Sequence, residues 1–352
     1  MSPEPTTSVR ARSQSSRLRP GAASFGGTRR LLVSLVLAAV LLTVLMLWGG
    51  VTPADLARAL GRLTPATYLT ALALHVSLYL LRTWRFAILV PPATRPRFGA
   101  LASVCASHTL AAFVLPAKIG EGAFVVYARD VCGLTAAEGL AALVVSRLLD
   151  MASLAISFGV ACFALEAVGS FPSIDWFLPA GAALCAGGAA FLALGARGDL
   201  LVRFAAWVSR RAMLDRFALG RSLLERAGEL ALALRRSGGE GRLARAGMVS
   251  VPIWLAIFLF CAVLARGLGL PETTTLAEAT FGSSMAMLTS LVPISAFANF
   301  GTLEAGWVLG FGLLGVPRDL ALETGAGLHL VQLANVVALG VLGHLGMALR
   351  RR

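Results

Sequence analysis

The sequence predicts an all-α polytopic membrane protein with about six full spans and two re-entrant helical hairpins arranged as inverted repeats. Three observations predict this fold class. Of the 352 residues, 57% are hydrophobic and only 14% are charged, whereas soluble domains carry about 25% charged residues. Several apolar runs reach roughly 18 residues, which is long enough to cross a bilayer as a helix. Proline and glycine interrupt two apolar regions at matching places in the two halves, a pattern typical of inverted repeats.

The first quarter of the chain predicts a cytoplasmic tail and two spans. Residues 1–30 are rich in Ser, Pro, Gly and Arg, a composition typical of a disordered tail. Span one, 31–50, follows Arg29-Arg30. No A-x-A cleavage site follows it at the right place, so we favour a retained span over a signal peptide. Span two, 67–90, ends among arginines, which places that end in the cytoplasm by the positive-inside rule.

Residues 31–349 are predicted to form a single transmembrane domain. After the first hairpin, at 98–131, span three at 138–165 runs outward and span four at 176–196 returns. Residues 197–246 hold eleven arginines against five acids. This composition predicts a basic cytoplasmic loop, with amphipathic helices lying on anionic lipid.

The second half repeats the order of span, hairpin and span. Span five, at 247–268, runs outward, residues 276–317 form a hairpin that enters from outside, and span six, at 324–349, runs inward. The repeats are therefore predicted at 67–165 and 247–349, with opposite orientation. The segment before each hairpin proline is long enough to cross the bilayer, and full crossing would leave the remaining topology unchanged. Both termini are predicted to be cytoplasmic.

Charge and motifs exclude several classes of function. The net charge is +13, but the arginines flank the spans, so we favour positive-inside bias over nucleic-acid binding. The five cysteines form no CxxC and no cluster with histidine, which argues against a metal site or a disulfide framework. The sequence also predicts no cofactor, and no HExxH, GxSxG or Walker motif is present. An enzyme is therefore the less favoured class.

The stretch LPAKIGEG at residues 115–122 is the first candidate site. It contains Lys118, which is the only lysine of the chain, and Glu121 three residues later. Charges between apolar segments are costly unless they are paired or face water. Broken backbone at membrane depth requires cover by protein or a water-filled cavity. The stretch VPISAFANFGTLEAG repeats the order of proline, glycine and glutamate, ending in Glu304.

Spans three and six carry further polar groups at helical spacing. Arg147 and Asp150 are three residues apart and can pair on one face of a helix. His329, Gln332 and Asn335 form a similar stripe. Either group could act in function or could simply hold helices together through hydrogen bonds.

The two copies are in register around these groups. Arg147 follows Gly133 by 14 residues, and His329 follows Gly315 by the same distance. The spacing from glutamate to glycine is 12 residues in the first copy and 11 in the second. Arg147 is therefore predicted to correspond to His329.

Two more groups have alternative readings. Arg82 and Arg85 in span two could extend to the lipid headgroups, or they could receive a lipid phosphate through paired hydrogen bonds. Glu304 has no basic neighbour in the sequence, which makes it a candidate for proton coupling. It could instead be the favourable acid at the start of a new helix.

The sequence resembles the flippase-type membrane domain of lysylphosphatidylglycerol synthases and their stand-alone relatives. The resemblance rests on the motifs LRTWRF, LPAKIGEG, SRLLD and VPISAFANFGTLEAG, and it covers about residues 31–349. It implies a domain that translocates or handles lipid, with Glu121, Arg147, Asp150 and Glu304 at a pseudo-symmetric centre. Phe124 and Ser146 stand where the family usually has an arginine and an acid. The soluble aminoacyl-transfer domain is missing, so lysyl transfer is not expected.

These observations lead to one preferred hypothesis and two alternatives. In the preferred hypothesis, the protein is a flippase or lipid transporter of the bacterial inner membrane that acts on an anionic or glycosylated lipid. The alternatives are a membrane transferase for polyprenyl-, glyco- or hopanoid-linked lipids, with Glu121 or Asp150 as base, and an accessory subunit that binds through the basic loop. A homo-oligomer is compatible with each. The predicted substrate-binding residues are Arg82, Arg85, Lys118, Glu121, Arg147, Asp150, Glu304, His329 and Gln332.

Overall fold

The described part of the chain is helical throughout. The computed structural model describes residues 52–94, 96–115, 120–169, 177–196, 241–290 and 297–350, together with Thr43 and Leu47. Its helices are α2 (Pro53–Gly61), α3 (Pro65–Leu89), α4 (Phe98–Val114), α5 (Ala123–Cys132), α6 (Ala136–Ala167), α7 (Phe177–Ala196), α10 (Arg242–Leu268), α11 (Leu276–Thr289), the short 3-10 helix η3 (Phe297–Asn299), α12 (Thr302–Leu313) and α13 (Arg318–Arg350).

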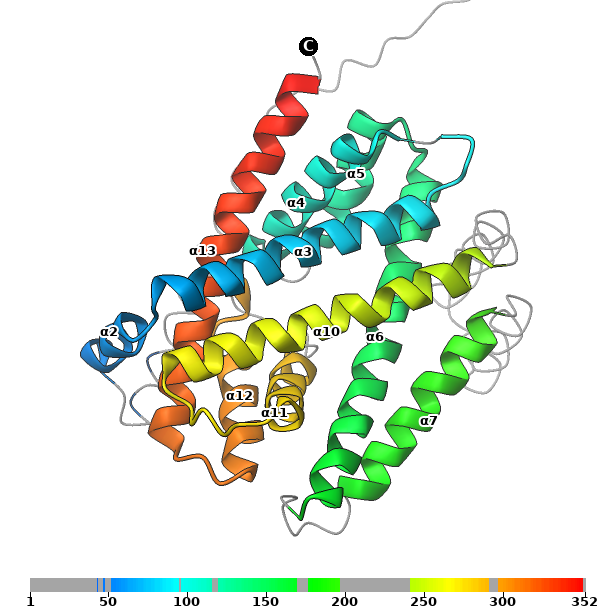
Figure 1. The fold of residues 1–352 in the computed structure, drawn as a ribbon. Coiled ribbons are helices and arrows are strands. Elements are labelled where there is room, and N and C mark those ends of the chain that lie inside the picture. Colours follow the sequence, from blue (N-terminus) through cyan, green and yellow to red (C-terminus); the bar gives the residue numbers. More distant parts are fainter. Residues whose placement is uncertain are drawn as a thin grey trace, which may run out of the picture.

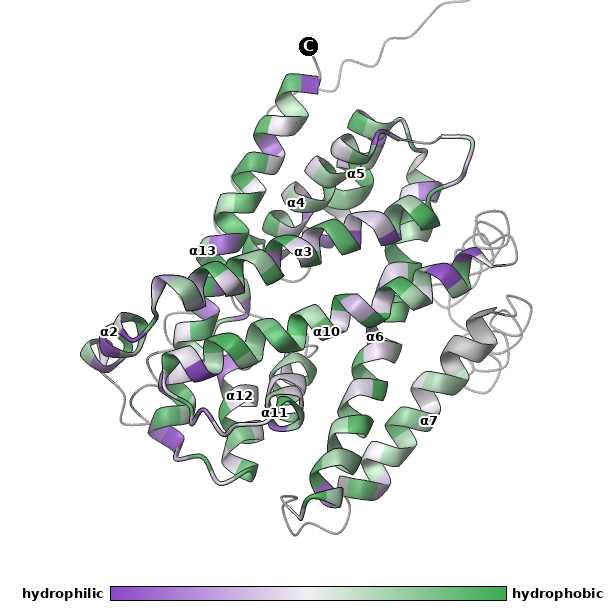
Figure 2. Ribbon diagram, viewed as in Figure 1, coloured by the Kyte–Doolittle hydropathy of each residue, from purple (hydrophilic) through white to green (hydrophobic). Residues whose placement is uncertain are grey.

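Four of these helices are long and apolar enough to cross a membrane: α3, α6, α10 and α13. Shorter apolar helices occupy Phe98–Val114 and Leu178–Ala190. Hydrophobic residues cover most of the length of the long helices (Figure 2). Predicted span one, the tail at 1–30 and most of the predicted loop at 197–246 lie outside the described residues. The count of six spans therefore remains a prediction.

Helix starts follow the capping rules. Thr135 and Glu138 form a capping box at the start of α6, and Thr275 and Glu278 form one at the start of α11. In each box the two side chains satisfy N–H groups that the first helical turn leaves without partners.

The helix α2 was not anticipated from the sequence. Its nine residues begin with a capping box between Thr52 and Asp55, and Asp55 also pairs with Arg58. Hydrogen bonds from Thr52 hold the pKa of the Asp55 carboxyl below its usual value.

Helices of the two halves pack against one another. Helices α3 and α10 lie side by side and run in opposite directions (Figure 1). Helix α4 of the first half packs along α13, and α11 of the second half packs against α6. Helix α7 packs along α6, in the order expected of spans three and four. The two halves therefore share one interior.

The hairpin of α11 and α12 is held by small residues, as the GxxxG at Gly306 and Gly310 indicates. A Cβ atom added to Gly306 would lie 2.7 Å from the Cα of Ala286 in α11. One added to Gly310 would lie 2.8 Å from the Cα of Gly282. Helix backbones that approach this closely leave no room for side chains.

Candidate functional site

A cluster of charged side chains lies between α3, α4 and α6. Arg85 is only 1% exposed, and its Nη1 donates to Asp150 Oδ1 at 2.8 Å. Its Nη2 donates to Ser146 Oγ at 2.7 Å, and its Nη1 also donates to Ser250 Oγ of α10 at 3.0 Å. Arg85 thus ties three helices together. The alternative that Arg85 extends outward to the headgroups is wrong, because pairing with Asp150 draws it inward.

The second ion pair of the cluster joins the first hairpin to α6. Arg147 donates from Nη2 to Glu121 at 2.6 and 2.7 Å and from Nε at 3.0 Å. It also reaches Asp150 at 3.3 Å, so the pairing predicted from their spacing is present. Glu121 has a further neighbour in His108 of α4, at 3.7 Å. Arg147 and Glu121 remain 40% and 31% exposed, so this pair is not enclosed by the described residues.

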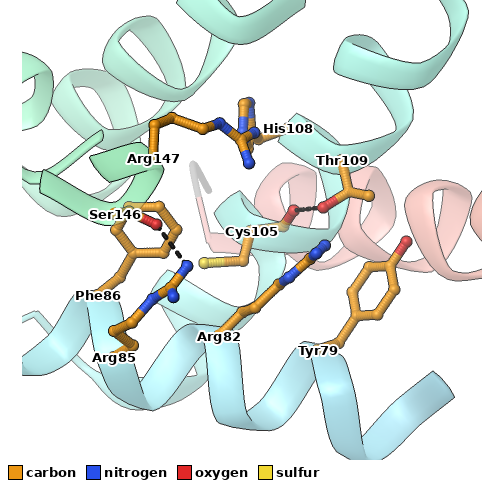
Figure 3. Close-up of a pocket in the computed structure, with 9 residues that line it drawn as sticks. All are labelled: Tyr79, Arg82, Arg85, Phe86, Cys105, His108, Thr109, Ser146 and Arg147. Atoms are coloured by element: carbon orange, nitrogen blue, oxygen red, sulfur yellow. Dashed lines mark hydrogen bonds between the residues drawn. The ribbon is translucent and has the colours of Figure 1, made fainter. Parts of the chain in front are cut away.

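Arg82 lies beside the cluster and is not part of its ion pairs. Its Nε is buried and has no hydrogen-bond partner in the described part of the chain. It lines a small pocket with eight other residues. The pocket is lined by Tyr79, Arg82, Arg85, Phe86, Cys105, His108, Thr109, Ser146 and Arg147. Figure 3 shows the guanidinium groups entering this space from α3 and α6.

The pocket and its surrounding pairs carry an excess of positive charge. Arg82, Arg85 and Arg147 contribute three cations, against the two carboxylates of Glu121 and Asp150. Guanidinium groups present N–H donors in a fork that matches phosphate and carboxylate oxygens. The pocket therefore suits an anionic group.

A second polar pair lies in the other half of the protein. Glu304 and His329 share a hydrogen bond of 2.6 Å between Oε1 and Nδ1, and both side chains are 0% exposed. The other carboxylate oxygen of Glu304 accepts from the N–H of Gly301 at 2.7 Å. The expectation that Glu304 lacks a basic partner is thus corrected by a residue 25 positions away. The structure also places Glu304 in the first turn of α12, as the alternative interpretation predicted.

Left-handed backbone precedes this pair. Ala298 and Asn299 have φ values of 52° and 61°, and Gly301 has a φ of 87°. A non-glycine residue in this region costs roughly 1–2 kcal/mol. The turn places Phe300 against the His329 ring, with centroids 4.2 Å apart.

The remaining predicted residues are distributed differently. Asn335 is buried and accepts a hydrogen bond from the Tyr68 hydroxyl at 3.0 Å. Gln332 is partly buried and makes no hydrogen bond within the described residues. Lys118 lies outside the described residues. No hydrogen bond or ion pair among the described residues joins the Glu304 pair to the arginine cluster.

Sequence reasoning missed three members of the cluster. His108 lies in the weakly hydrophobic segment before the hairpin proline. A single histidine in such a segment was the one feature of the sequence that could have indicated a role. Ser146 directly precedes Arg147, and only its position hinted at a role. Ser250 lies among apolar residues near the start of predicted span five, and nothing in that pattern marked it.

Comparison with known protein families decides the identity of the fold. The family described as the lysylphosphatidylglycerol synthase TM region matches residues 31–340. The chain belongs to this family. The lysylphosphatidylglycerol synthase TM region is a membrane domain, so the long apolar helices are those of a multi-pass membrane protein with a lipid-related function. A comparison with curated proteins finds no relative of this chain.

Within the described residues, no three His, Cys, Asp or Glu side chains lie together as metal ligands would.

Proposed function

We propose that the protein binds the headgroup of an anionic or glycosylated lipid in the Arg82 pocket and moves that lipid across the bacterial inner membrane. The observation that carries this proposal is the buried Arg82 Nε, which faces a polar pocket without a partner. A buried donor without an acceptor is costly. A phosphate oxygen entering the pocket would remove that cost, and the guanidinium would gain a charge-assisted hydrogen bond.

The neighbouring arginines have other roles in this proposal. Arg85 already donates to Asp150, Ser146 and Ser250, so it holds the wall of the pocket. Arg147 is paired with Glu121 but remains 40% exposed. It can therefore exchange Glu121 for a headgroup as the lipid enters beside the first hairpin.

We infer that the two halves are inverted repeats that rock against each other. Several pairings support this inference. Helices α3 and α10 run in opposite directions, and the contact of α4 with α13 has its counterpart in the contact of α11 with α6. Glu121 pairs with a base 26 residues later, and Glu304 pairs with one 25 residues later.

The transferase alternative requires Glu121 or Asp150 to act as a general base. Both carboxylate oxygens of Glu121 accept hydrogen bonds from Arg147, and both oxygens of Asp150 are held by arginines. A base must be within reach of the proton that it abstracts. These pairings favour translocation over transfer chemistry.

Translocation can be tested in proteoliposomes that contain acyl-NBD phosphatidylglycerol or an acyl-NBD glucosyl lipid. Dithionite added outside quenches only the outer leaflet, so the rate of further quenching reports movement between leaflets. We expect Arg82→Gln to reduce the initial rate for phosphatidylglycerol at least tenfold. Arg129→Gln is the matched control, because Arg129 is 61% exposed and lies outside the pocket. Its rate should stay within twofold of wild type.

Two outcomes would contradict the proposal. Wild-type protein that moves neither probe faster than empty liposomes would argue against a flippase. A lipid whose total amount disappears from cells lacking the gene, while a precursor accumulates, would favour the transferase. An unchanged total with a smaller outer-leaflet share would support translocation.

A further inference from the structure

The buried Glu304–His329 pair differs from every other charged pair described in this protein. Both side chains are 0% exposed and 2.6 Å apart. Phe300 stacks on the imidazole ring, and Phe113 of α4 contacts it edge-on, with centroids 5.6 Å apart. The pair is therefore enclosed, and the Nε2 atom of His329 is a buried ring nitrogen with no hydrogen-bond partner among the described residues.

Charge balance fixes the number of protons that this enclosed pair can hold. With one proton, the pair is neutral overall, either as carboxylate and imidazolium or as carboxylic acid and imidazole. Without that proton it is a buried anion, and with a second proton it is a buried cation. An uncompensated charge in the membrane interior is strongly unfavourable. Without a compensating charge elsewhere in the protein, the enclosed pair therefore retains one proton.

The equivalent pair in the first half does not have this property. Arg147 stands where the second half has His329, and an arginine stays protonated at all physiological pH values. Histidine changes its charge between about pH 5 and 8. The Glu121–Arg147 pair is also 31% and 40% exposed, whereas the Glu304–His329 pair is closed. One half thus carries a permanently charged and partly exposed pair, and the other carries an enclosed pair whose histidine can change its charge.

No other described titratable group is bonded to this pair. His108 of α4 contacts Glu121, and Glu278 of α11 caps its own helix. On α13, Glu323 is partly buried, and His344 bonds the carbonyl of Gly340. On α2, Asp55 bonds Thr52 and Arg58. No titratable residue lies in η3 (Phe297–Asn299).

We propose that Glu304 and His329 form a proton-binding site that couples lipid movement to the proton gradient. The inference rests on the proposed function and adds its energy source. When the hairpin of α11 and α12 opens to water, His329 takes up one proton at its ring, and the pair becomes neutral. Closure then encloses the pair together with its proton. Opening to the other side releases the lipid and that proton to water. The deprotonated pair then returns with the pocket empty, when the one excess positive charge of the cluster, three arginines against two carboxylates, offsets the negative charge of the pair.

The left-handed residues at the start of the second hairpin arm fit this cycle. Ala298 and Asn299 hold Phe300 against the imidazole ring, and strained backbone is concentrated at segments that move. Relaxing this turn would lift Phe300 and open His329 to water.

The test measures lipid movement and proton gradient together. Proteoliposomes of phosphatidylethanolamine and phosphatidylglycerol at 3:1 contain acyl-NBD phosphatidylglycerol, and the inside and outside differ by one pH unit. With one proton moved per lipid, the wild type should shift the ratio of the probe between leaflets up to tenfold, because one pH unit corresponds to a factor of ten. Reversing the gradient should reverse the shift.

Three variants isolate the pair. Glu304→Gln should give the same ratio of the probe between leaflets with and without the gradient. His329→Arg, which copies the fixed pair of the first half, should do the same. Glu278→Gln is the matched control, since Glu278 also caps a helix as its third residue but is only partly buried, and its capping hydrogen bond is exposed. It should shift the ratio as the wild type does.

The possible outcomes separate this inference from the proposed function. If the wild type moves the probe but ignores the gradient, the inference is wrong and translocation stands. If no probe moves, infrared difference spectra of the same proteoliposomes between pH 5 and 8 decide. A change in carboxyl or imidazole bands that is lost in both Glu304→Gln and His329→Arg supports the proton site, and its absence overturns it. A variant that fails to fold is recognised by aggregation in detergent, and Glu304→Asp then replaces Glu304→Gln, with a weakened shift expected.

Discussion

Arg82 and Arg85 lie one helical turn apart on α3, and each has a buried Nε without a described partner, but only Arg85 has side-chain hydrogen bonds from its other nitrogens among the described residues. Arg85 donates three hydrogen bonds to side chains of α6 and α10. Arg82 lines the pocket with a buried Nε that has no described partner. A buried charge that has its partners contributes to the architecture of the protein, while one that lacks them is available to a ligand. The two arginines should therefore respond differently to substitution.

Replacing Arg85 should destabilise the protein. Arg85→Leu leaves Asp150 buried beside an apolar side chain, and breaking a buried ion pair on one side costs about 3–5 kcal/mol. Arg85→Leu combined with Asp150→Leu should cost less than Arg85→Leu alone, because no acid then loses its main partner. The free energy of unfolding in mixed micelles measures both. Arg129→Leu, at a 61% exposed position, should change that free energy little. Equal losses for the single and the double variant would contradict this explanation.

At the scale of elements, close approach of backbones determines how the second hairpin packs. Gly306 and Gly310 let α12 lie against α11 with almost no space between the chains. The side of α12 that carries Gly312 is open, and nothing lies within 4 Å of a Cβ atom added there. One short helix thus carries both a tight and a free face.

Gly306→Leu should separate the two arms of this hairpin. Overpacking of this kind costs about 1–3 kcal/mol, and it should also loosen the Glu304 pair at the start of α12. The melting temperature in detergent should fall, and cysteines placed on α11 should become more accessible to an aqueous thiol reagent. Gly312→Leu, on the same helix, should leave both measurements unchanged. A similar fall for Gly312→Leu would show that helix propensity, and not packing, causes the effect.

The elements also show what the sequence could and could not predict. Hydropathy reports the transfer of a segment into the membrane, so α3, α6, α10 and α13 were predicted near their observed bounds. The short amphipathic α2 gives no such signal. Helix α10 begins at Arg242, inside the predicted loop, directly after Gly241 with its left-handed backbone, and hydropathy does not mark that start.

For the candidate site, spacing predicted the pairing of Arg147 with Asp150, but tertiary contacts decided the rest. The register of the two copies aligned Arg147 with His329, and each pairs with the glutamate of its own hairpin. Nothing local linked Arg85 to Ser250, which is 165 residues away. Such long-range partners follow from helix packing, which the composition of a segment does not encode.

In the whole molecule, helices of each half pack against helices of the other half, so each half depends on the other for its stability. Helix α4 packs along α13, and α11 packs against α6. A half expressed alone would expose these faces, including the close glycine contacts of α13 with α4, where a Cβ atom on Gly343 would lie 2.8 Å from Ala106. The interior is thus completed only when both halves are present.

A chain cut within 197–240 should therefore assemble only from both pieces. Coexpressed pieces should copurify on a tag carried by one of them, since the faces of α4, α13, α6 and α11 find their partners in the membrane. Each piece alone should aggregate in detergent. Size-exclusion chromatography distinguishes these results. A single piece that elutes as a uniform species would contradict the dependence of the halves on each other.

The bonds that Arg85 makes to α6 and α10 also affect the rate at which the protein can open. Any motion that separates α3 from α6 and α10 must break the bonds of Arg85 to Asp150, Ser146 and Ser250. If opening forfeits about 3 kcal/mol from this buried pair, it becomes roughly a hundredfold slower than the same motion without it. Diffusion of the lipid to the pocket does not require these bonds to break. The turnover rate would then be set by the opening of the protein, and the concentration of lipid would hardly affect it.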